Sequence, residues 1–202
     1  YIAREALAMK SETFEAKTVV ISGSGNVAIY ACEKAQSLGA NVVAMCDSNG
    51  WIYDRNGIDI SMVKKIKEER RGRISEYVDV RPGAEYHEGK GVWAVTCDIA
   101  LPCATQNELD FDDAKLLVKN GVKLIAEGAN MPTTIPATEY LIEKGVVFIP
   151  GKAANAGGVA TSGLEMSQNA QRLNWTFDEV DEMLQTIMAS IHKRVYTASE
   201  NY

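Results

Sequence analysis

Short apolar runs alternate with longer amphipathic stretches along most of this chain. Compact runs of Val, Ile, Leu and Ala, bounded by Gly, Pro or polar residues, are typical of buried strands. The stretches between them carry helix-forming residues at helical spacing. We therefore expect strands at 18–22, 41–46, 98–101, 122–126 and 146–149, with a short extra strand at 51–53.

Helices are expected between these strands, and the last two should form a long C-terminal pair. Ser61 is the expected cap of one helix, and another should begin after Gly157 and Gly158, for which a flexible loop is one interpretation. Thr176, followed by Glu179, has the pattern of a capping box. The expected helices are 2–9, 27–38, 61–71 with a second one up to 80, 110–120, 138–144, 159–173 and 177–198. This order predicts an α/β fold of the Rossmann type, a doubly wound and mostly parallel sheet with helices on both faces.

The composition narrows the classes of function. The chain has 202 residues and a formal charge of −6, which disfavours nucleic-acid binding. No apolar run is long enough to cross a bilayer, so no membrane partner is expected. The 4 cysteines form no C-x-x-C pair and the 2 histidines are far apart, which predicts reduced thiols, no metal site and a cytoplasmic location. We expect one domain over 1–202, and because both ends look cut, a fragment of a longer protein.

The most specific local motif lies between the first expected strand and its helix. Gly23–Ala28 follows the pattern G-x-G-x-x-A, and the next strand ends in Asp47. In a dinucleotide-binding turn, the first glycine permits the tight turn and Gly25 lets a pyrophosphate approach the backbone. The helix N-terminus then offers free N–H groups to the phosphates. The alternative interpretations of this motif are an ordinary glycine turn and the related glycine turn of a methyltransferase. The predicted contacts are Ser24, Gly25, Asn26 and Val27.

Three further stretches carry a family resemblance. They are Leu101–Leu109 (LPCATQNEL), Glu127–Thr134 (EGANMPTT) and Pro150–Asn169 (PGKAANAGGVATSGLEMSQN). With the glycine turn, they resemble the cofactor-binding domain of hexameric bacterial-type glutamate dehydrogenases, within the Glu/Leu/Phe/Val dehydrogenase family. The resemblance implies reversible oxidative deamination of L-glutamate to 2-oxoglutarate and ammonia with NAD(P). The family's catalytic lysine and aspartate belong to a separate substrate domain, so no catalytic residue is expected here.

The resemblance also implies a set of contacts and an assembly. Ser162 would hydrogen-bond the side-chain carboxylate of glutamate, with a helix cap as the alternative role. The full-length protein would be a homohexamer, while the present chain would be a monomer or weak dimer that binds dinucleotide without turnover. The implied cofactor contacts are Ala104 and Thr105 at the adenosine ribose, Gly128, Ala129 and Asn130 at the nicotinamide ribose, and Asn155 at the carboxamide.

The choice between NADP and NAD depends on residues after the second strand. Asp47 alone favours NAD, because a carboxylate accepts hydrogen bonds from both ribose hydroxyls and repels a 2′-phosphate. Ser48 can donate to a phosphate, and Lys67 and Arg70 would share a helix face. In the resembled NADP-preferring enzymes, matching basic residues reach the 2′-phosphate. We therefore predict NADP, with NAD possible; a solvated basic helix face is the alternative interpretation.

Functions of other classes are also compatible with parts of the sequence. A nucleotide-sensing module without catalysis could keep this fold, and a different amino-acid substrate could be used by a related dehydrogenase. Gly151-Lys152 resembles the end of a phosphate-binding loop, but Ala153 stands where that motif needs Ser or Thr. We therefore reject a P-loop.

Overall fold

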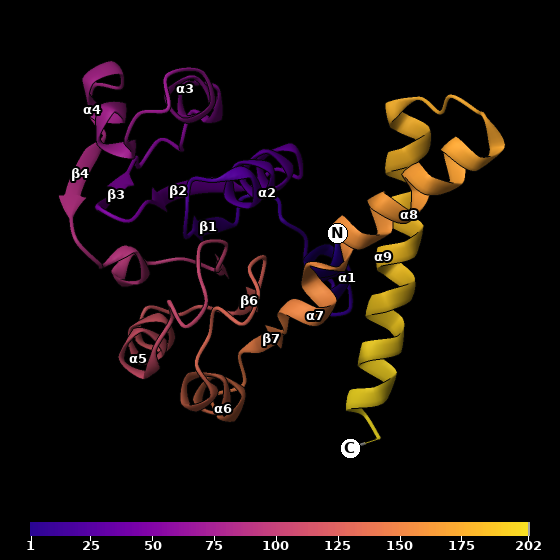
Figure 1. The fold of residues 1–202 in the computed structure, drawn as a ribbon. Coiled ribbons are helices and arrows are strands. Elements are labelled where there is room, and N and C mark those ends of the chain that lie inside the picture. The colour runs from indigo at the N-terminus through magenta and orange to yellow at the C-terminus, as the bar shows by residue number, and fades with distance from the viewer. Residues whose placement is uncertain (202) are drawn as a thin grey trace.

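A seven-stranded sheet forms the centre of the computed structural model, which describes residues 1–201 (Figure 1). The strand order is β4-β3-β2-β1-β5-β6-β7. The five parallel strands are β1 (Thr18–Ile21), β2 (Asn41–Cys46), β5 (Ile99–Leu101), β6 (Leu124–Ala126) and β7 (Val147–Ile149). Two antiparallel strands, β3 (Gly50–Tyr53) and β4 (Glu85–Glu88), extend one edge. The chain winds outward from β1 in both directions, which confirms the doubly wound fold.

Both faces of the sheet are buried, because the strand residues alternate between two apolar cores. Val19 and Ile21 of β1 point into one core, while Val20 points into the other. The first core is covered by α1, α2, α7 and α9, and the second by α5, α6 and a 3₁₀ turn. Continuous apolar strands are therefore required here, as expected for a parallel sheet between helical layers.

The helices follow the expected order, with some shifted boundaries. The α-helices are α1 (Ile2–Ala8), α2 (Asn26–Ser37), α3 (Ile60–Lys64), α4 (Tyr77–Val80), α5 (Phe111–Lys119), α6 (Ile135–Glu143), α7 (Gly151–Ala154), α8 (Ala156–Gln171) and α9 (Phe177–Ser199). A π-helical segment, Lys65–Glu69, and 3₁₀ turns at Ile74–Glu76 and Val92–Ala94 complete the helical elements of the described chain.

Two expectations for helix starts are wrong. Asp59, not Ser61, caps α3, because its carboxylate accepts hydrogen bonds from the backbone N–H groups of Ser61 and Met62. Gly157 and Gly158 lie inside the first turn of α8 and form no loop. Strand β4 was not predicted, because its polar residues at the sheet edge lack the apolar pattern of a buried strand.

The long pair α8 and α9 is confirmed and packs together beside α1 (Figure 1). The capping box is present, with the Thr176 hydroxyl accepting from Glu179 N–H and the Glu179 carboxylate accepting from Thr176 N–H. None of the residues of α8 is buried. Its apolar side chains Val159 and Met166 are 79% and 72% exposed, so this helix is held by α9 and not by the sheet.

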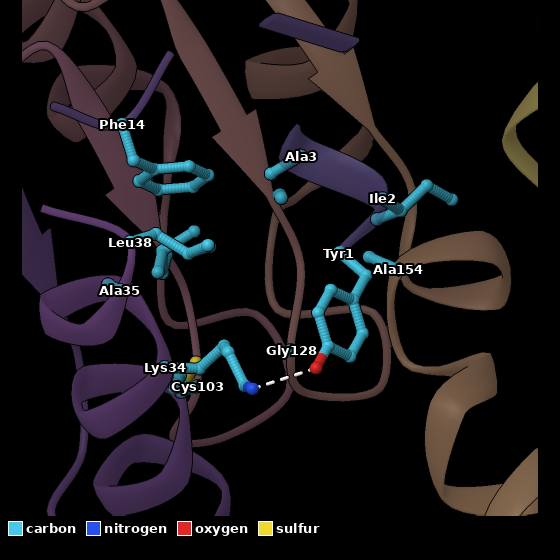
Figure 2. Close-up of a pocket in the computed structure, with 13 residues that line it drawn as sticks. Tyr1, Ile2, Ala3, Phe14, Lys34, Ala35, Leu38, Cys103, Gly128 and Ala154 are labelled. Atoms are coloured by element: carbon cyan, nitrogen blue, oxygen red, sulfur yellow. Dashed lines mark hydrogen bonds between the residues drawn. The ribbon is translucent and has the colours of Figure 1, made fainter. Parts of the chain in front are cut away.

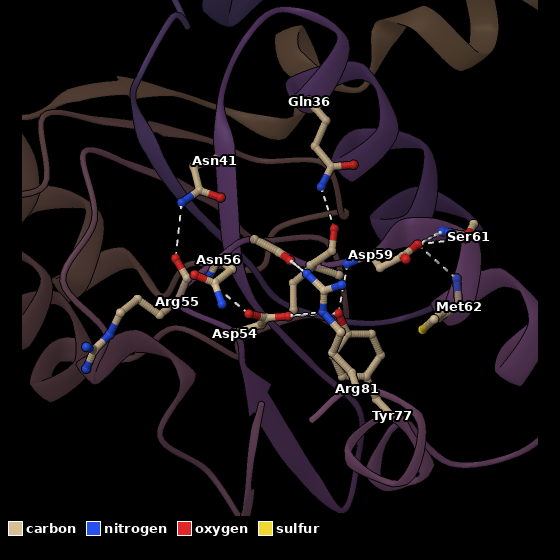
Figure 3. Close-up of polar contacts among 12 residues, drawn as sticks. Gln36, Asn41, Asp54, Arg55, Asn56, Asp59, Ser61, Met62, Tyr77 and Arg81 are labelled. Atoms are coloured by element: carbon tan, nitrogen blue, oxygen red, sulfur yellow. Dashed lines mark hydrogen bonds and ion pairs between the residues drawn. The ribbon is translucent and has the colours of Figure 1, made fainter. Parts of the chain in front are cut away.

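A buried acidic side chain fastens α4 to the antiparallel edge of the sheet (Figure 3). Asp54 follows β3, is 1% exposed, and accepts from Arg81 Nε at 2.7 Å and the Tyr77 hydroxyl at 3.2 Å. The Tyr77 oxygen in turn accepts from Asp59 N–H at 2.8 Å. Burial raises the pKa of Tyr77 to about 12, so its hydroxyl stays protonated as a donor. This cluster anchors both ends of the segment between β3 and β4.

Candidate functional site

The glycine turn connects β1 to α2 at the carboxyl edge of the sheet. Gly23 has φ +87°, and a Cβ there would lie 3.1 Å from the Cys103 carbonyl oxygen. Gly25 is the N-cap of α2 and has no neighbouring atom within 4 Å of a Cβ position. Because no side chain caps α2, its first N–H groups, including those of Asn26 and Val27, are available to an anion.

A cavity of about 580 Å³ opens in front of this turn, along the carboxyl ends of β1, β2 and β5. This is the switch point of a doubly wound sheet, where ligands of such folds bind. The volume is within the range of small-molecule sites. Of the residues predicted from sequence, those lining the cavity are Ser24, Gly25, Asp47, Ser48, Lys67, Ala104 and Thr105.

Asp47 lies at one end of the cavity, and its carboxylate already serves the protein backbone. One oxygen accepts from Asn49 N–H at 2.8 Å and Gly50 N–H at 3.3 Å, and the other from Ile74 N–H at 3.0 Å. Burial opposes ionisation, but these N–H groups and Lys67 together lower the pKa of Asp47 below its ordinary value. Asp47 therefore holds the turn after β2 against the segment around Ile74, with few acceptor positions left for a ribose.

Basic side chains gather beside Asp47. Lys67 Nζ lies 3.9 Å from an Asp47 oxygen and donates to the Gly72 carbonyl at 3.0 Å. Arg73 also lines the cavity, and its guanidinium donates to the Ser48 hydroxyl at 3.1 Å. We call Ser48, Lys67 and Arg73 the basic corner. It presents hydrogen-bond donors to an anion in the part of the cavity beyond the carboxyl end of β2.

Arg70, which the sequence analysis paired with Lys67, is not among the residues that line the cavity. The pairing assumed α-helical spacing, whereas 65–69 is π-helical and Arg70 N–H donates to the Lys65 carbonyl. Arg71 then has φ +54°, so the chain reverses and brings Arg73 back to the corner. Arg73 belongs to the same stretch of basic residues, Lys64–Arg73, but nothing in the pattern distinguished it from the others.

Glu108 lies under the glycine turn and was not singled out from the sequence. Its carboxyl oxygen accepts from the Ser22 hydroxyl at 2.8 Å and from Ala104 N–H at 3.0 Å. Ser22 in turn accepts from Cys103 N–H at 2.8 Å. Burial raises the pKa of Glu108, although these hydrogen bonds oppose the shift. The network fixes the loop after β5 against the turn after β1. In the sequence, the indication of this role was the position of Glu108 within the motif Leu101–Leu109.

The loops after β6 and β7 meet at the other end of the site. Asn155 Nδ2 donates to Asn130 Oδ1 at 2.7 Å and lies 3.5 Å from the Ala129 carbonyl oxygen. Gly128 and Ala129 donate their N–H groups to the Pro102 carbonyl at 2.8 and 3.0 Å. A Cβ on Gly128 would lie 2.6 Å from Cys103 Sγ, so only glycine fits there. The structure thus joins these predicted residues to the loop after β5.

Ser162 is not joined to this group by any contact that the structure shows. It is exposed and lies well inside α8, which excludes the role of a helix cap. Lys152 is exposed in the short helix α7 and does not line the cavity. Ser162 therefore stays a prediction from the resemblance alone.

A smaller apolar groove of about 160 Å³ lies between α1 and α2 and shares Cys103 and Gly128 with these loops (Figure 2). Lys34 donates to the Tyr1 hydroxyl at 2.7 Å across it. Its other lining residues are apolar, so it offers little to a phosphate. The larger cavity offers more to an anionic ligand, because its donors include free backbone N–H groups and the basic corner.

Several other groups bear on the classes of function considered above. The cysteines are all free, and burial raises the pKa of Cys46 and Cys103 to about 12, so both are neutral thiols. Residues 1–201 contain no group of three or more His, Cys, Asp or Glu side chains arranged to hold a metal ion. Over the same residues, no helix combines the length and the apolar character needed to cross a membrane.

Comparisons with known proteins show which family the chain resembles. The family described as Glutamate/Leucine/Phenylalanine/Valine dehydrogenase matches residues 1–202. The NADP-specific glutamate dehydrogenase of Haemophilus influenzae is 58% identical over 195 residues, covering 95% of this chain and 43% of that protein. The NAD(P)-specific glutamate dehydrogenase of Xylanibacter ruminicola is 49% identical over 195 residues, covering 95% and 44%.

A solved structure gives the same result for the fold. Plasmodium falciparum glutamate dehydrogenase 2 superposes with a TM-score of 0.98 at 46% identity, covering all of this chain and 45% of that one. The chain therefore spans less than half the length of the relatives it matches.

Proposed function

The chain belongs to the glutamate/leucine/phenylalanine/valine dehydrogenase family, and from this premise we propose that it is the dinucleotide-binding part of an NADP-preferring glutamate dehydrogenase. The observation that supports NADP over NAD is the basic corner. The Asp47 carboxylate is engaged by backbone N–H groups, while Lys67 and Arg73 border the open cavity. A 2′-phosphate would meet Ser48, Lys67 and Arg73 there.

The remaining residues would hold the dinucleotide along the carboxyl edge of the sheet. The N–H groups at the start of α2, with Ser24 and Gly25, would bind the pyrophosphate. Ala104 and Thr105 would line the adenosine ribose. Gly128, Ala129 and Asn130 would approach the nicotinamide ribose, and Asn155 with Asn130 would orient the carboxamide. These assignments follow from the resemblance and from the place of each residue beside the cavity or its neighbouring loops.

The proposed overall reaction converts L-glutamate, NADP⁺ and water to 2-oxoglutarate, ammonium, NADPH and a proton. The cofactor, when bound, accepts the hydride released from the substrate carbon. This chain would bind and orient the dinucleotide and contribute Ser162 to the substrate carboxylate. We assign no proton-transferring group to the chain. The full-length protein is proposed to be a cytoplasmic homohexamer.

A titration tests this function with the 202-residue protein. By calorimetry, NADPH should bind more tightly than NADH, S-adenosylmethionine should not bind, and glutamate should not cause cofactor reduction. Binding of S-adenosylmethionine alone would favour the methyltransferase alternative. Normal glutamate-dependent reduction would show that the catalytic groups are present after all. NADPH binding by a full-length protein that is inactive with every amino acid would favour a nucleotide sensor.

Ser162→Ala is expected to weaken glutamate more than cofactor in the full-length enzyme. Loss of a hydrogen bond to a charged group costs about 1.5–3 kcal/mol, or roughly ten- to a hundredfold in substrate affinity or efficiency. Steady-state kinetics with NADP⁺ held saturating would measure the effect. Ser167→Ala, on the same helix, is the matched control, because its hydroxyl only donates to the Gly163 carbonyl. An unchanged glutamate KM and kcat in Ser162→Ala would rule out the substrate contact.

A further inference from the structure

We infer that Glu127 is a positioning residue that sets the spacing of the two asparagines at the nicotinamide end of the dinucleotide. Glu127 follows β6 directly and is 5% exposed. It touches neither the open cavity nor a proposed phosphate contact. The inference deepens the proposed function and rests on it, because it concerns how the chain holds the nicotinamide.

The carboxyl group of Glu127 joins two separate segments. One oxygen accepts from Thr133 N–H at 3.2 Å, within the loop that follows β6. The other accepts from Gly151 N–H at 2.6 Å, where α7 begins after β7. A buried carboxyl group with a backbone donor on each oxygen is well satisfied. Loss of either acceptor would leave a buried N–H group without a partner, which favours separation of the segments.

The two joined segments carry the two asparagines. Asn130 lies on the loop after β6, and Asn155 follows α7. The hydrogen bond from Asn155 Nδ2 to Asn130 Oδ1 leaves the Asn155 Oδ1 acceptor and the Asn130 Nδ2 donor facing no partner among residues 1–201. A primary carboxamide has one acceptor oxygen and one donor NH₂ group, so it matches this pair. The match depends on the distance between the segments.

Close backbone contact limits that distance from the other side. A Cβ on Gly151 would lie 2.8 Å from the Ala129 carbonyl oxygen and 3.4 Å from the Glu127 carboxyl group. The segments therefore lie too close together to admit a side chain at Gly151, and Glu127 holds them there. The hydrogen bonds of Glu127 draw the two segments together, and steric contact at Gly151 limits their approach. The separation of the two asparagines is thereby fixed, as the orientation of a planar amide requires.

The experiment compares two ligands that differ only at the nicotinamide end. NADPH and 2′-phospho-ADP-ribose share the pyrophosphate, both riboses and the 2′-phosphate. Dissociation constants are measured by calorimetry for the unchanged 202-residue protein and for Glu127→Gln, in which an NH₂ group replaces one acceptor oxygen. We expect Glu127→Gln to weaken NADPH about tenfold and 2′-phospho-ADP-ribose less than about twofold.

Two further variants separate positioning from general stability. Gly151→Ala forces the same segments apart from the opposite side and should weaken NADPH selectively as well. Asp54→Asn is the matched control, because Asp54 is also a buried acid with backbone and side-chain donors, but it lies at the far edge of the sheet. Asp54→Asn should lower the melting temperature without changing the ratio of the two affinities.

The other outcomes overturn the inference in distinguishable ways. Equal weakening of both ligands by Glu127→Gln, or an altered ratio in Asp54→Asn, would show a merely structural role. Equal affinities of the unchanged protein for the two ligands would show that the chain does not hold the nicotinamide, while dinucleotide binding would stand. If the unchanged protein binds neither ligand, the proposed function is wrong and the positioning role falls with it.

Discussion

Gly25→Val is expected to abolish dinucleotide binding and to leave the protein folded. Gly25 has φ −84° and ψ −174°, an extended conformation that valine adopts readily. Apart from its neighbours in the chain, no atom lies within 4 Å of the added Cβ, so the core is not disturbed. The branched side chain would instead enter the cavity at the start of α2, where the pyrophosphate is proposed to bind. We expect affinity to fall by at least about a hundredfold, equivalent to about 2.7 kcal/mol.

The measurement pairs a dissociation constant for NADPH with a melting temperature. Gly163→Val is the matched control, because a Cβ there also meets nothing within 4 Å and α8 lies outside the cavity lining. Gly25→Ala should give an intermediate loss, since the methyl group fills less of the cavity. Unchanged affinity in Gly25→Val would show that the turn at Gly23–Ala28 is not the phosphate site.

The double variant Lys67→Ala with Arg73→Ala should lose NADPH affinity by at least about a hundredfold, while NADH affinity changes little. Each side chain would form a charge-assisted hydrogen bond with the 2′-phosphate, worth about 1.5–3 kcal/mol. Arg73 is exposed, so solvent screens its contribution and the lower value applies to it. NADH has no 2′-phosphate, and the backbone N–H groups that bind the pyrophosphate are untouched by these substitutions.

Titrations of both cofactors over a range of salt concentrations test this prediction. The preference of the unchanged protein for NADPH should shrink as salt rises. Lys64→Ala with Lys65→Ala is the control pair: Lys64 is paired with Glu33, and neither residue lines the cavity. Arg73→Ala alone should weaken NADPH binding more than Arg70→Ala does. The structure places Arg73 at the cavity, whereas helical spacing in the sequence predicted Arg70. An NADH preference in the unchanged protein would contradict the prediction and would indicate that Asp47 binds the ribose hydroxyls of NAD.

Asp47 shows why an acidic residue after the second strand does not by itself decide the cofactor. The sequence places a carboxylate where a ribose diol would bind in an NAD enzyme. In the structure, one of its oxygens accepts from Ile74 N–H, which lies far along the chain beyond the π-helical segment. The same contact brings Arg73 to the cavity. The acid therefore helps to build the basic corner, so its presence is compatible with NADP.

The sequence by itself determined the parallel strands of the sheet, their winding and the glycine turn. These features are encoded by neighbouring residues: apolar runs for strands buried on both faces, and glycines where φ is positive or a backbone approaches closely. Thr176 and Glu179 likewise fixed the start of α9 through a contact within one helical turn. For these features, contacts between close neighbours made the pattern of residue types sufficient.

Tertiary structure decided the features that join distant segments. The π-helical segment and the reversal at Arg71 placed Arg73, and not Arg70, beside Ser48. The polar edge strand β4 exists because β3 offers it a ladder, not because its own residues favour burial. The proposed role of Glu127 depends on its two oxygens, which accept hydrogen bonds from the backbones of two different loops. Hydrogen bonds and packing across such separations depend on where the chain returns in space, which no local pattern of hydrophobic and polar residues specifies.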